Sequence, residues 1–543
     1  MRGSMMNFPL TMNHVLERAG RYFGDREIAS RRPDRTIHRY TYADFHRRAK
    51  QLASALQKAG LRRGDRVATM MWNHSGHLEA YFGVPYAGGV VHTLNPRLHP
   101  AEIAAIANHA GDRFLIVDDV LLPIFEKVRD KVTFERAIVM PFGGCGPSGN
   151  LQSYEEFLTS GSEDFAAAEA DENDAAAMCF TSGTTGQSKG VVYSHRALAL
   201  HSLGLALPDS MELSMRSVVF PVSPMFHANA WGIPWVSVMI GAQIFFPGPN
   251  VDAETVLDTM VAENVTHSCA VPTVWLGVQA ALEKEPGRWK FERPVKILCG
   301  GTAPPAALIR ALDRANLRIT HGWGMTETAP LATVGALKPK MKSWPEDEQL
   351  NRRAMQGLTV PFIEVRVMRP EGEARNDGQT PGEIEIRGPW IASSYFESPD
   401  QHHRWTKDGW FKTGDIATMD EEGYLRIVDR AKDLIKSGGE WISSVDLENA
   451  LIGHPAVREA AVVGVPHPKW QERPIAVVVL KDGATAPAEE LRAFLAQKFA
   501  KWQLPDAFVF VNELPHTSVG KLLKMKLREQ YRDWEWSAQD QVR

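Results

Sequence analysis

Apolar residues in the first part of the chain recur with the period of a helix. Between residues 41 and 60 they return every three or four positions, which is the spacing of one helix face. These positions are Phe45, Ala49, Leu52, Ala53 and Leu56. Thr41 opens the stretch with Asp44 three residues later, and Gly60 closes it. The pattern therefore predicts a capped amphipathic helix.

Short apolar runs then alternate with further helical stretches. Residues 66–72, 113–117 and 136–140 have the length and composition of buried strands, and residues 100–110 those of a helix. Strands that alternate with helices form largely parallel sheets whose two faces are both covered by helices. We therefore expect an α/β fold with a large N-terminal domain of layered sheets and flanking helices.

The pattern changes after about residue 380. Strand-like runs at 382–387 and 423–428 are separated by glycine and charged turns, and the charged run 429–433 follows. The rest of the chain has two strand-like runs and a helical stretch of its own, at 460–465, 475–480 and 488–499. About 110 residues can hold a small core. We predict a boundary between residues 1–431 and a separate, mobile C-terminal α+β domain, 432–543, hinged near Lys432.

Composition excludes several classes of protein. The 543 residues carry 61 Lys and Arg against 65 Asp and Glu, a net charge of −4, so no positive field gathers nucleic acid. The four cysteines form no CxxC pair, which argues against a disulfide framework or structural zinc and favours a cytoplasmic location. The most apolar stretch, 231–248, is interrupted by proline and glycine and is too short for a transmembrane segment.

Residues 181–190 (TSGTTGQSKG) predict a phosphate-binding loop. Small hydroxyl residues and glycines let backbone N–H groups approach an anion, and Lys189 adds a positive charge. The spacing is not that of a Walker A loop. A flexible polar linker is the alternative, but apolar runs at 175–180 and 191–193 place the loop between ordered elements. The GxGxxG match at 144–149 lacks a following helix and is interpreted as an exposed loop.

Further motifs follow in a fixed order along the chain. They are 224–227 (PMFH), 300–304 (GGTAP), 321–327 (HGWGMTE), 410–415 (WFKTGD), 429–433 (DRAKD), 436–441 (KSGGEW) and 515–521 (PHTSVGK). Together with the 181–190 loop, this set resembles the adenylate-forming superfamily of acyl-CoA synthetases, adenylation domains and luciferases. Within it, the chain is most similar to bacterial medium- and long-chain fatty acid–CoA ligases. It departs from the family pattern at Ser188, where proline is usual, and at His516, where arginine is usual.

The resemblance implies a reaction in two halves. A fatty acid carboxylate attacks the α-phosphate of ATP to form an acyl-adenylate and pyrophosphate, and the thiol of CoA then displaces AMP. Catalytic roles would fall to Lys521, His227, Thr184 and Glu327, with Mg²⁺ held by Thr184 and Glu327. Residues 1–431 would be the AMP-binding (adenylation) domain.

The resemblance also implies a set of binding residues. ATP and AMP would contact Thr181, Ser182, Gly183, Thr184, Thr185, Gly186, Lys189, Gly301, Thr302, Ala303, His321, Gly322, Trp323, Gly324, Met325, Thr326, Asp415, Arg430 and Lys432. CoA would contact Lys436, Gly438, Gly439, Glu440 and Trp441. The acyl pocket would be lined by Trp231, Trp235, Val271 and Pro272.

Ordinary structural roles compete with these assignments. Trp231, Trp323 and His227 could be core residues, and Glu327 could be a helix-capping partner. Arg430 and Lys521 could be solvated charges, Asp415 a surface turn, and Gly438 and Gly439 a capping turn.

Other functions also remain open: a CoA ligase for a short sulfur-containing or branched acid, or adenylation with transfer to a carrier protein. A regulator with a degenerate site would be expected to lack Lys521, Glu327 or Asp415, and all three are present. Acyl chain length and oligomeric state, a homodimer included, stay open.

Overall fold

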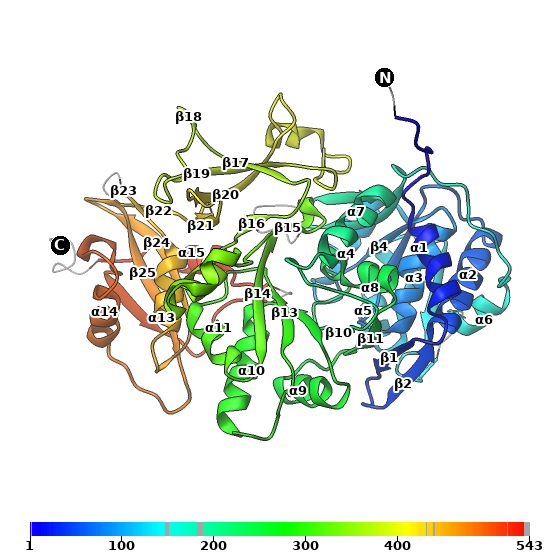
Figure 1. Cartoon of the computed structure of the whole chain (residues 1–543), viewed down its shortest axis with the longest axis horizontal. Helices are drawn as coiled ribbons and strands as arrows, with labels where there is room; N and C mark the ends of the chain where they lie inside the picture. The colour runs from blue at the N-terminus through cyan, green and yellow to red at the C-terminus, as the bar shows by residue number, and fades with distance from the viewer. Residues whose placement is uncertain are drawn as a thin grey trace.

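The fold is that of a computed structural model, and it describes residues 1, 3–146, 151–181, 188–430, 432–437, 440–517 and 520–536, without the side chain of Glu440. The chain forms a large N-terminal part and a smaller C-terminal part (Figure 1). Several predicted site residues lie outside the described residues: Ser182, Gly183, Thr184, Thr185, Gly186, Gly438 and Gly439.

A nine-stranded sheet forms the centre of the N-terminal part. Its inner strands run parallel, while β2, β15 and β16 pair antiparallel. The order is β16 (Leu358–Thr359), β15 (Leu331–Val334), β14 (Leu317–Gly324), β13 (Val295–Cys299), β12 (His267–Ala270), β10 (Val218–Pro221), β11 (Gln243–Phe246), β1 (Glu27–Arg31) and β2 (Ile37–Thr41).

A seven-stranded sheet lies beside it and is parallel except for the β8–β9 pair. The order is β7 (Gln152–Ser153), β6 (Arg136–Met140), β5 (Asp112–Asp118), β3 (Arg66–Met70), β4 (Val90–Thr93), β8 (Ala175–Phe180) and β9 (Gly190–Ser194). The strands expected near 66–72, 113–117 and 136–140 are therefore confirmed.

Helices cover both faces of the two sheets. They are α1 (Met12–Tyr22), α2 (Tyr42–Lys58), α3 (Ser75–Tyr86), α4 (Pro100–Ala110), α5 (Leu122–Phe125), α6 (Tyr154–Thr159), α7 (His195–Ala206), α8 (Ile233–Ile240), α9 (Ala253–Ala262), α10 (Pro272–Lys284), α11 (Ala306–Asp313) and α12 (Glu346–Ala354). The capping box predicted for α2 is present, since Asp44 N donates to Thr41 Oγ1 and Thr41 N to Asp44 Oδ2.

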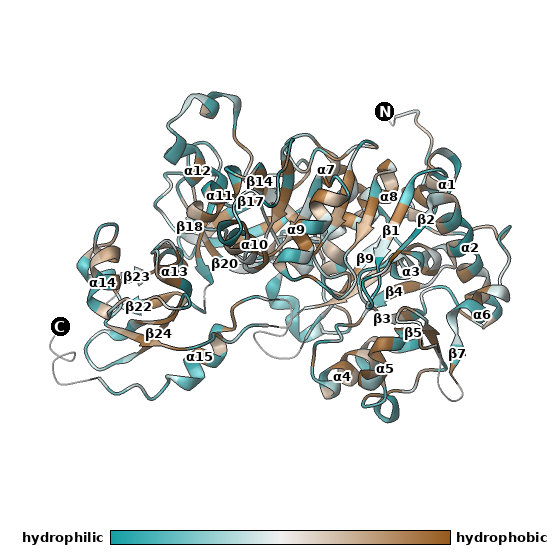
Figure 2. Ribbon diagram, turned by 90° about the horizontal axis from the view of Figure 1, so that it is seen from below, coloured by the Kyte–Doolittle hydropathy of each residue, from teal (hydrophilic) through white to brown (hydrophobic). Residues whose placement is uncertain are grey.

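One layer of helices serves both sheets, because a shared core joins residues of α1, α2, α3 and α8 to strands of each sheet. Successive residues of a strand point to opposite faces. Leu298 of β13 faces this shared core, whereas its neighbours Ile297 and Cys299 face a second core beneath α9, α10 and α11. Figure 2 shows hydrophilic residues on outer segments such as α12 and hydrophobic residues concentrated in the strands that they surround.

A five-stranded sheet follows, built from β18 (Gly372–Glu373), β17 (Glu364–Arg369), β19 (Gly382–Arg387), β20 (Phe411–Met419) and β21 (Leu425–Arg430). The C-terminal sheet pairs β23 (Glu440–Ile442), β22 (Ile435–Ser437), β25 (Gln471–Leu480) and β24 (Val457–His467), with β26 (Ala507–Phe510) beside β25. Its helices are α13 (Ser444–Ile452), α14 (Ala488–Ala496) and α15 (Lys524–Gln530). The expected small α+β domain is confirmed, with its own two cores.

No helix among the described residues is long and apolar enough to cross a membrane. The apolar stretch 231–248 folds instead as the buried helix α8 and strand β11. All four cysteines lie within the described residues as free thiols.

Candidate active site

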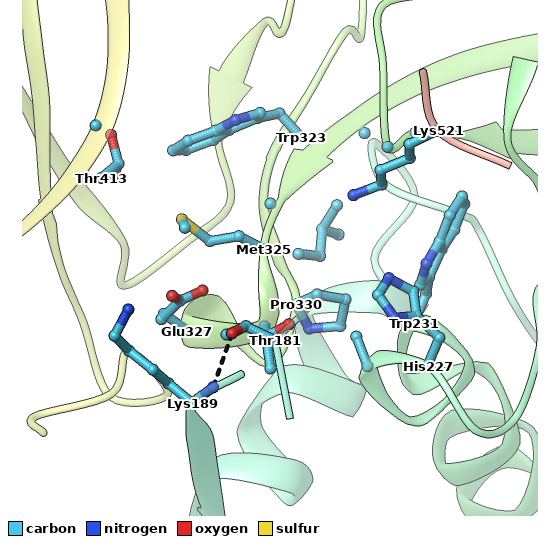
Figure 3. Close-up of a pocket in the computed structure, with 18 of the residues that line it drawn as sticks. Thr181, Lys189, His227, Trp231, Trp323, Met325, Glu327, Pro330, Thr413 and Lys521 are labelled. Carbon is cyan, nitrogen blue, oxygen red and sulfur yellow. Dashed lines mark hydrogen bonds between the residues drawn. The ribbon is translucent and has the colours of Figure 1, made fainter. Parts of the chain in front are cut away.

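A cavity of about 260 Å³ opens between the N-terminal sheets, the five-stranded sheet and the C-terminal domain. Figure 3 shows side chains from these different parts of the chain pointing into it. Fourteen of the sequence-predicted site residues that the structure describes line it: Thr181, Lys189, His227, Trp231, Gly301, Gly322, Trp323, Gly324, Met325, Thr326, Glu327, Arg430, Lys432 and Lys521.

The ends of the predicted phosphate loop are held together where β8 and β9 pair. Thr181 N donates to Lys189 O at 2.9 Å, and Lys189 N donates to Thr181 Oγ1 at 3.0 Å (Figure 3). Ser188, which stands where the family usually has proline, donates its hydroxyl to Glu102 Oε1 at 3.2 Å. The hydroxyl thus attaches this end of the loop to α4. The hydrogen bond makes up in part for the stiffness that is lost where proline is absent.

Glu327 presents a buried carboxylate at one end of the cavity; the residue is 4% exposed. Tyr395 donates its hydroxyl to Glu327 Oε1. Burial, and then the Glu327 carboxylate, raise the pKa of Tyr395, so the phenol remains a donor. The Nζ atom of Lys189 lies 5.7 Å from the centre of the Tyr395 ring. This end therefore combines a carboxylate and a cation.

Trp323 and Arg430 also line the cavity, and both contact Asp415 behind it. Trp323 Nε1 donates to Asp415 Oδ2 at 3.0 Å, and Arg430 Nε lies 2.7 Å from Asp415 Oδ1. The ion pair raises the pKa of Arg430. A flat indole beside a carboxylate fixed in place suits an aromatic base with a hydroxylated sugar.

Lys521 comes from the C-terminal domain yet lies in this cavity (Figure 3). A Cβ atom at Gly301, whose φ is +87°, would lie 3.1 Å from Lys521 Cε, so glycine leaves the lysine its room. Burial and then the Arg430 cation lower the pKa of Lys521 to about 8, while Asp415 and Glu327 oppose this shift. Burial, and then Lys521, lower the pKa of His227 to about 3, so the imidazole is neutral.

Trp231 and His227 flank the cavity together, as expected, but the backbone between them is unusual. Residues Ala228, Asn229, Ala230 and Trp231 all have φ between 38° and 58°, which is a left-handed turn. Asn229 N donates to Cys179 Sγ at 3.2 Å and helps to hold it. Residues with side chains rarely adopt this backbone conformation, so the spacing of His227 and Trp231 did not predict it.

The structure does not place Trp235 where the expected acyl pocket required it. It is fully buried in α8, and its ring centre lies 4.9 Å from those of Tyr81 and Phe82 in the shared core. It does not line the cavity. Because α8 begins only at Ile233, Trp235 faces α3 rather than the substrate side.

A second cavity of about 290 Å³ continues between the two domains. It shares residues such as Trp323, Arg430 and Lys521 with the first cavity, and it adds the predicted residues Pro272, Thr302, Ala303, His321 and Asp415. Val271 lies beside it, because its Cγ1 would be 3.1 Å from a Cβ at Gly301.

The described residues of the expected CoA-binding set do not line these cavities. Lys436 and Trp441 line neither cavity; they sit on the β22–β23 hairpin, where Lys436 Nζ lies 4.9 Å from the centre of the half-exposed Trp441 ring. The backbone of Glu440 belongs to the same hairpin. The structure thus brings together the nucleotide and lysine residues but not this set.

Sequence reasoning missed several cavity residues, including Tyr395, Gln401, Arg404, Thr413 and Gly414. Thr413 and Gly414 belong to the motif 410–415. Their position next to the predicted site residue Asp415 could have indicated that they line the cavity. Tyr395, Gln401 and Arg404 come from an irregular segment whose spacing predicts no face.

The described residues contain no cluster of three or more His, Cys, Asp or Glu side chains that could hold a metal alone. Glu327 is a hard oxygen donor in the cavity, and Mg²⁺ keeps several waters and substrate phosphates as ligands. The Glu327 carboxylate is therefore a suitable ligand for Mg²⁺ that enters with ATP, while Thr184 lies outside the described residues.

Comparison with known proteins decides the family. Residues 16–396 match the model of the AMP-binding enzyme family, and residues 446–521 match the AMP-binding enzyme C-terminal domain. The chain belongs to the AMP-binding enzyme family. The resemblance to adenylate-forming enzymes is therefore confirmed, as is the expected fold.

Relatives of this AMP-binding enzyme match over almost their whole length. A long-chain-fatty-acid–CoA ligase of Thermus thermophilus is 47% identical, with 98% of this chain and 97% of the relative covered. A 3-methylmercaptopropionyl-CoA ligase of Ruegeria pomeroyi is 42% identical, with 98% and 99% covered. The solved structure of the anthranilate CoA ligase AuaEII with anthranoyl-AMP has a TM-score of 0.86 at 25% identity, with 98% and 99% covered.

Proposed function

We propose that this AMP-binding enzyme converts a medium- to long-chain fatty acid to its acyl-CoA through an acyl-adenylate, with release of AMP and pyrophosphate. The observation that carries the proposal is the position of Lys521. A lysine from the C-terminal domain lies in the same cavity as Trp323, Glu327 and Arg430. One cavity can therefore receive a base, phosphates and a carboxylate together.

In the first half-reaction, Lys521 would hold the acid carboxylate and the α-phosphate close to each other. Both are anions, so a cation lowers the cost of their approach and stabilises the charge that gathers in the transition state. Trp323 would stack on adenine, Asp415 would accept the ribose hydroxyls, and Arg430 would stay beside them. His227, neutral at physiological pH, would orient the carboxylate without adding charge.

Glu327, with the hydroxyl of Thr184, would hold Mg²⁺. The ion would neutralise phosphate charge when it is bound with ATP. Tyr395 fixes Glu327 Oε1 by its hydrogen bond, so Oε2 would be the oxygen offered to the ion.

For the second half-reaction, the C-terminal domain would turn about Lys432, with residues 432–543 moving as one unit. This motion would withdraw Lys521 and bring Lys436, Gly438, Gly439, Glu440 and Trp441 to the site for CoA. Exposure of Lys436 and Trp441 away from both cavities supports two arrangements of the domains. Such domain closures commonly separate two steps at one site.

The acyl group is the least constrained part of the proposal. Trp231 and the small residue Gly300 flank an apolar side of the cavity: a Cβ at Gly300 would lie 3.7 Å from the Trp231 ring. A fatty acid suits such a slot. The second candidate substrate is 3-methylmercaptopropionate, because a relative of 42% identity bears that activity in its name.

We infer a cytoplasmic location from the free thiols of all four cysteines, and a homodimer as the assembly to be tested by native mass.

The test is a panel of acids. Purified protein with ATP, Mg²⁺ and CoA should release AMP with straight-chain acids of medium to long length, and less with 3-methylmercaptopropionate or benzoate. Preference for the sulfur acid would favour the second candidate. AMP release that does not require CoA at all would contradict CoA ligation.

A further inference from the structure

Arg404 is an arginine in the cavity that forms no ion pair with a described residue, although it lies over the Phe411 ring. It is the last residue of a short 3₁₀ segment, Pro399–Arg404, and it lines the cavity together with Gln401. Its Nε atom is buried and has no hydrogen-bond partner, and no carboxylate of the described chain forms an ion pair with it. The other arginine of the cavity, Arg430, is paired with Asp415.

The Arg404 guanidinium lies between the motif that carries Asp415 and the end of the cavity that carries Glu327. A Cβ atom at Gly414 would lie 3.6 Å from Arg404 Nη2 and 3.7 Å from Nη1, and the Phe411 ring centre is 5.4 Å from its central carbon. Its charge also lowers the pKa of the Tyr395 phenol against the larger upward effects of burial and Glu327. Arg404 thus lies near the Tyr395–Glu327 pair.

Lys189 lies on the same side. Its Nζ is 5.7 Å from the Tyr395 ring centre, and no ion pair with a described residue neutralises it. Two unpaired cations therefore stand near the carboxylate that fits Mg²⁺. A partly buried charge without a counter-ion is costly, and an anionic ligand removes that cost.

We propose that Arg404 binds the phosphates of ATP that leave as pyrophosphate, which makes it a further substrate-binding residue for the reaction. The proposal rests on the proposed function. When a carboxylate oxygen bonds to the α-phosphorus, the bond from that phosphorus to the bridging oxygen breaks, and its electron pair stays on pyrophosphate. The planar guanidinium can donate two hydrogen bonds to this growing negative charge. No proton transfer is required.

A purely structural role makes a different prediction. If Arg404 only stacks on Phe411, its replacement changes stability but not the discrimination between ATP and AMP. If it binds the leaving phosphates, its replacement weakens the binding of ATP and inorganic pyrophosphate. The binding of AMP, which lacks those groups, stays unchanged. The ratio of the ATP and AMP dissociation constants therefore separates the two roles.

The experiment measures dissociation constants for ATP, AMP and inorganic pyrophosphate by calorimetry with Mg²⁺. The variants are Arg404→Gln and Arg404→Met, which remove the charge and keep much of the stem. The matched control is Arg387→Gln, because Arg387 also lies over an aromatic ring, at 4.4 Å from Trp410, but pairs with Glu364 outside the cavity. Thermal melting selects the variants that fold.

We expect Arg404→Gln or Arg404→Met, whichever folds, to raise the dissociation constants for ATP and pyrophosphate by about tenfold or more. This is the effect of losing a hydrogen bond to a charged group. The dissociation constant for AMP in these variants, and all three constants in the Arg387→Gln control, should stay within about twofold of the wild-type values. Unchanged ATP binding, or an equal loss for AMP, overturns the proposal. Since binding is measured without an acid or CoA, a wild-type protein that binds ATP but makes no acyl-CoA would overturn the proposed function alone.

Discussion

Lys521 is the residue at which the C-terminal domain reaches the nucleotide cavity. Its ammonium group is desolvated between Gly301 and His227, and its pKa is lowered to about 8. A lysine with this pKa still carries its charge at neutral pH. Anionic substrates would raise the pKa again on binding, so the charge is most secure when it is needed.

Replacing this ammonium should separate the two half-reactions. Lys521→Ala should slow acyl-adenylate formation by roughly 10²-fold or more, the usual effect of losing one positioned electrostatic group. Conversion of supplied acyl-adenylate and CoA should stay near wild type if, as proposed, the domain rotation withdraws Lys521 for that step. Rapid-quench assays of each half-reaction measure both. Lys526→Ala, an exposed lysine five residues further on, is the control, and equal losses in both halves would reject the role.

The pKa of Lys521 also predicts a pH dependence. A lysine is a cation only below its pKa, so kcat/KM for ATP in the adenylation half-reaction should fall as pH rises through about 8. His227, with a pKa of about 3, should add no step between pH 5 and 8. ATP–pyrophosphate exchange without CoA measures this and avoids titration of the CoA thiol.

The variant Lys521→Arg supplies the comparison for this profile. Its guanidinium stays protonated throughout, so whatever activity it retains should lack the fall near pH 8. A fall at the same pH in both proteins would assign the titration to another group.

Which single residues could be predicted depended on motif and position. Lys521, Glu327 and Trp323 stand in motifs, and the structure brings them to one cavity. Tyr395 and Arg404 could not be predicted, because they come from an irregular segment that reaches the cavity only through contacts with distant parts of the chain. The placement of Trp235 at the cavity could not be judged from sequence, which does not tell which face of a short and almost wholly apolar helix meets the core.

At the scale of elements, the left-handed turn before α8 holds Trp231 against the cavity. Four successive residues with positive φ are costly for L-amino acids, so contacts elsewhere must maintain the turn. Asn229 supplies two of them, its backbone to Cys179 and its side-chain Nδ2 to Thr93 Oγ1. These contacts fix the backbone that carries Trp231 beside the cavity.

If Trp231 gates the acyl slot, Trp231→Ala should change the ratio of kcat/KM values between short and long acids. Each methylene in an apolar pocket is worth about 1 to 3 kcal/mol, while the KM for ATP should stay nearly unchanged. AMP release across the acid panel measures the ratio. Trp235→Phe is the control, because Trp235 lies in the core and should alter melting but not preference.

A core role for Trp231 leads to the opposite result. The variant would then lose about 3 to 5 kcal/mol of stability with no change in chain-length preference. An unchanged preference in a destabilised Trp231→Ala enzyme would therefore reject the gate.

For the elements themselves, sequence was most informative where one face is apolar. The helix α2 and its capping box follow directly from residues 41–60. The left-handed turn could not be predicted, because Ala228, Ala230 and Trp231 disfavour that conformation and a single asparagine, which tolerates it, does not indicate four such residues in succession. The same limit applies to the two large sheets, whose strands are apolar on both faces and so do not reveal which helices they share.

At the scale of the whole molecule, several contacts surround the predicted hinge at Lys432, some between the two domains and some within the C-terminal one. Asp429, the last residue but one of β21, accepts a hydrogen bond from Ser444 N at 2.8 Å and from the Ser444 hydroxyl. Arg426 pairs with Asp446 at 2.8 Å. Arg528 of α15 donates to the Lys432 carbonyl at 3.0 Å and pairs with Asp433. These contacts join β21 to α13 and hold the segment 432–433 in the present arrangement.

The change of pattern near residue 380 indicated where the type of sheet changes. The arrangement of the sheets depends on contacts that the sequence does not show. The five-stranded sheet already begins at β17, before that change, and its strand β21 leads directly into the hinge. Only the charged run 429–433 indicated where the two parts separate, and its exact pivot remains a prediction.

A proline at the pivot should therefore hold the domains in one arrangement. Lys432→Pro fixes φ near −65° and removes the backbone N–H, so the change of dihedrals needed for rotation is blocked. We expect one half-reaction to fail while the other survives, each measured separately from ATP and acid or from supplied acyl-adenylate and CoA. Lys432→Ala, which keeps backbone freedom, should sustain both halves. Wild-type rates for both halves in Lys432→Pro would place the hinge elsewhere in the chain.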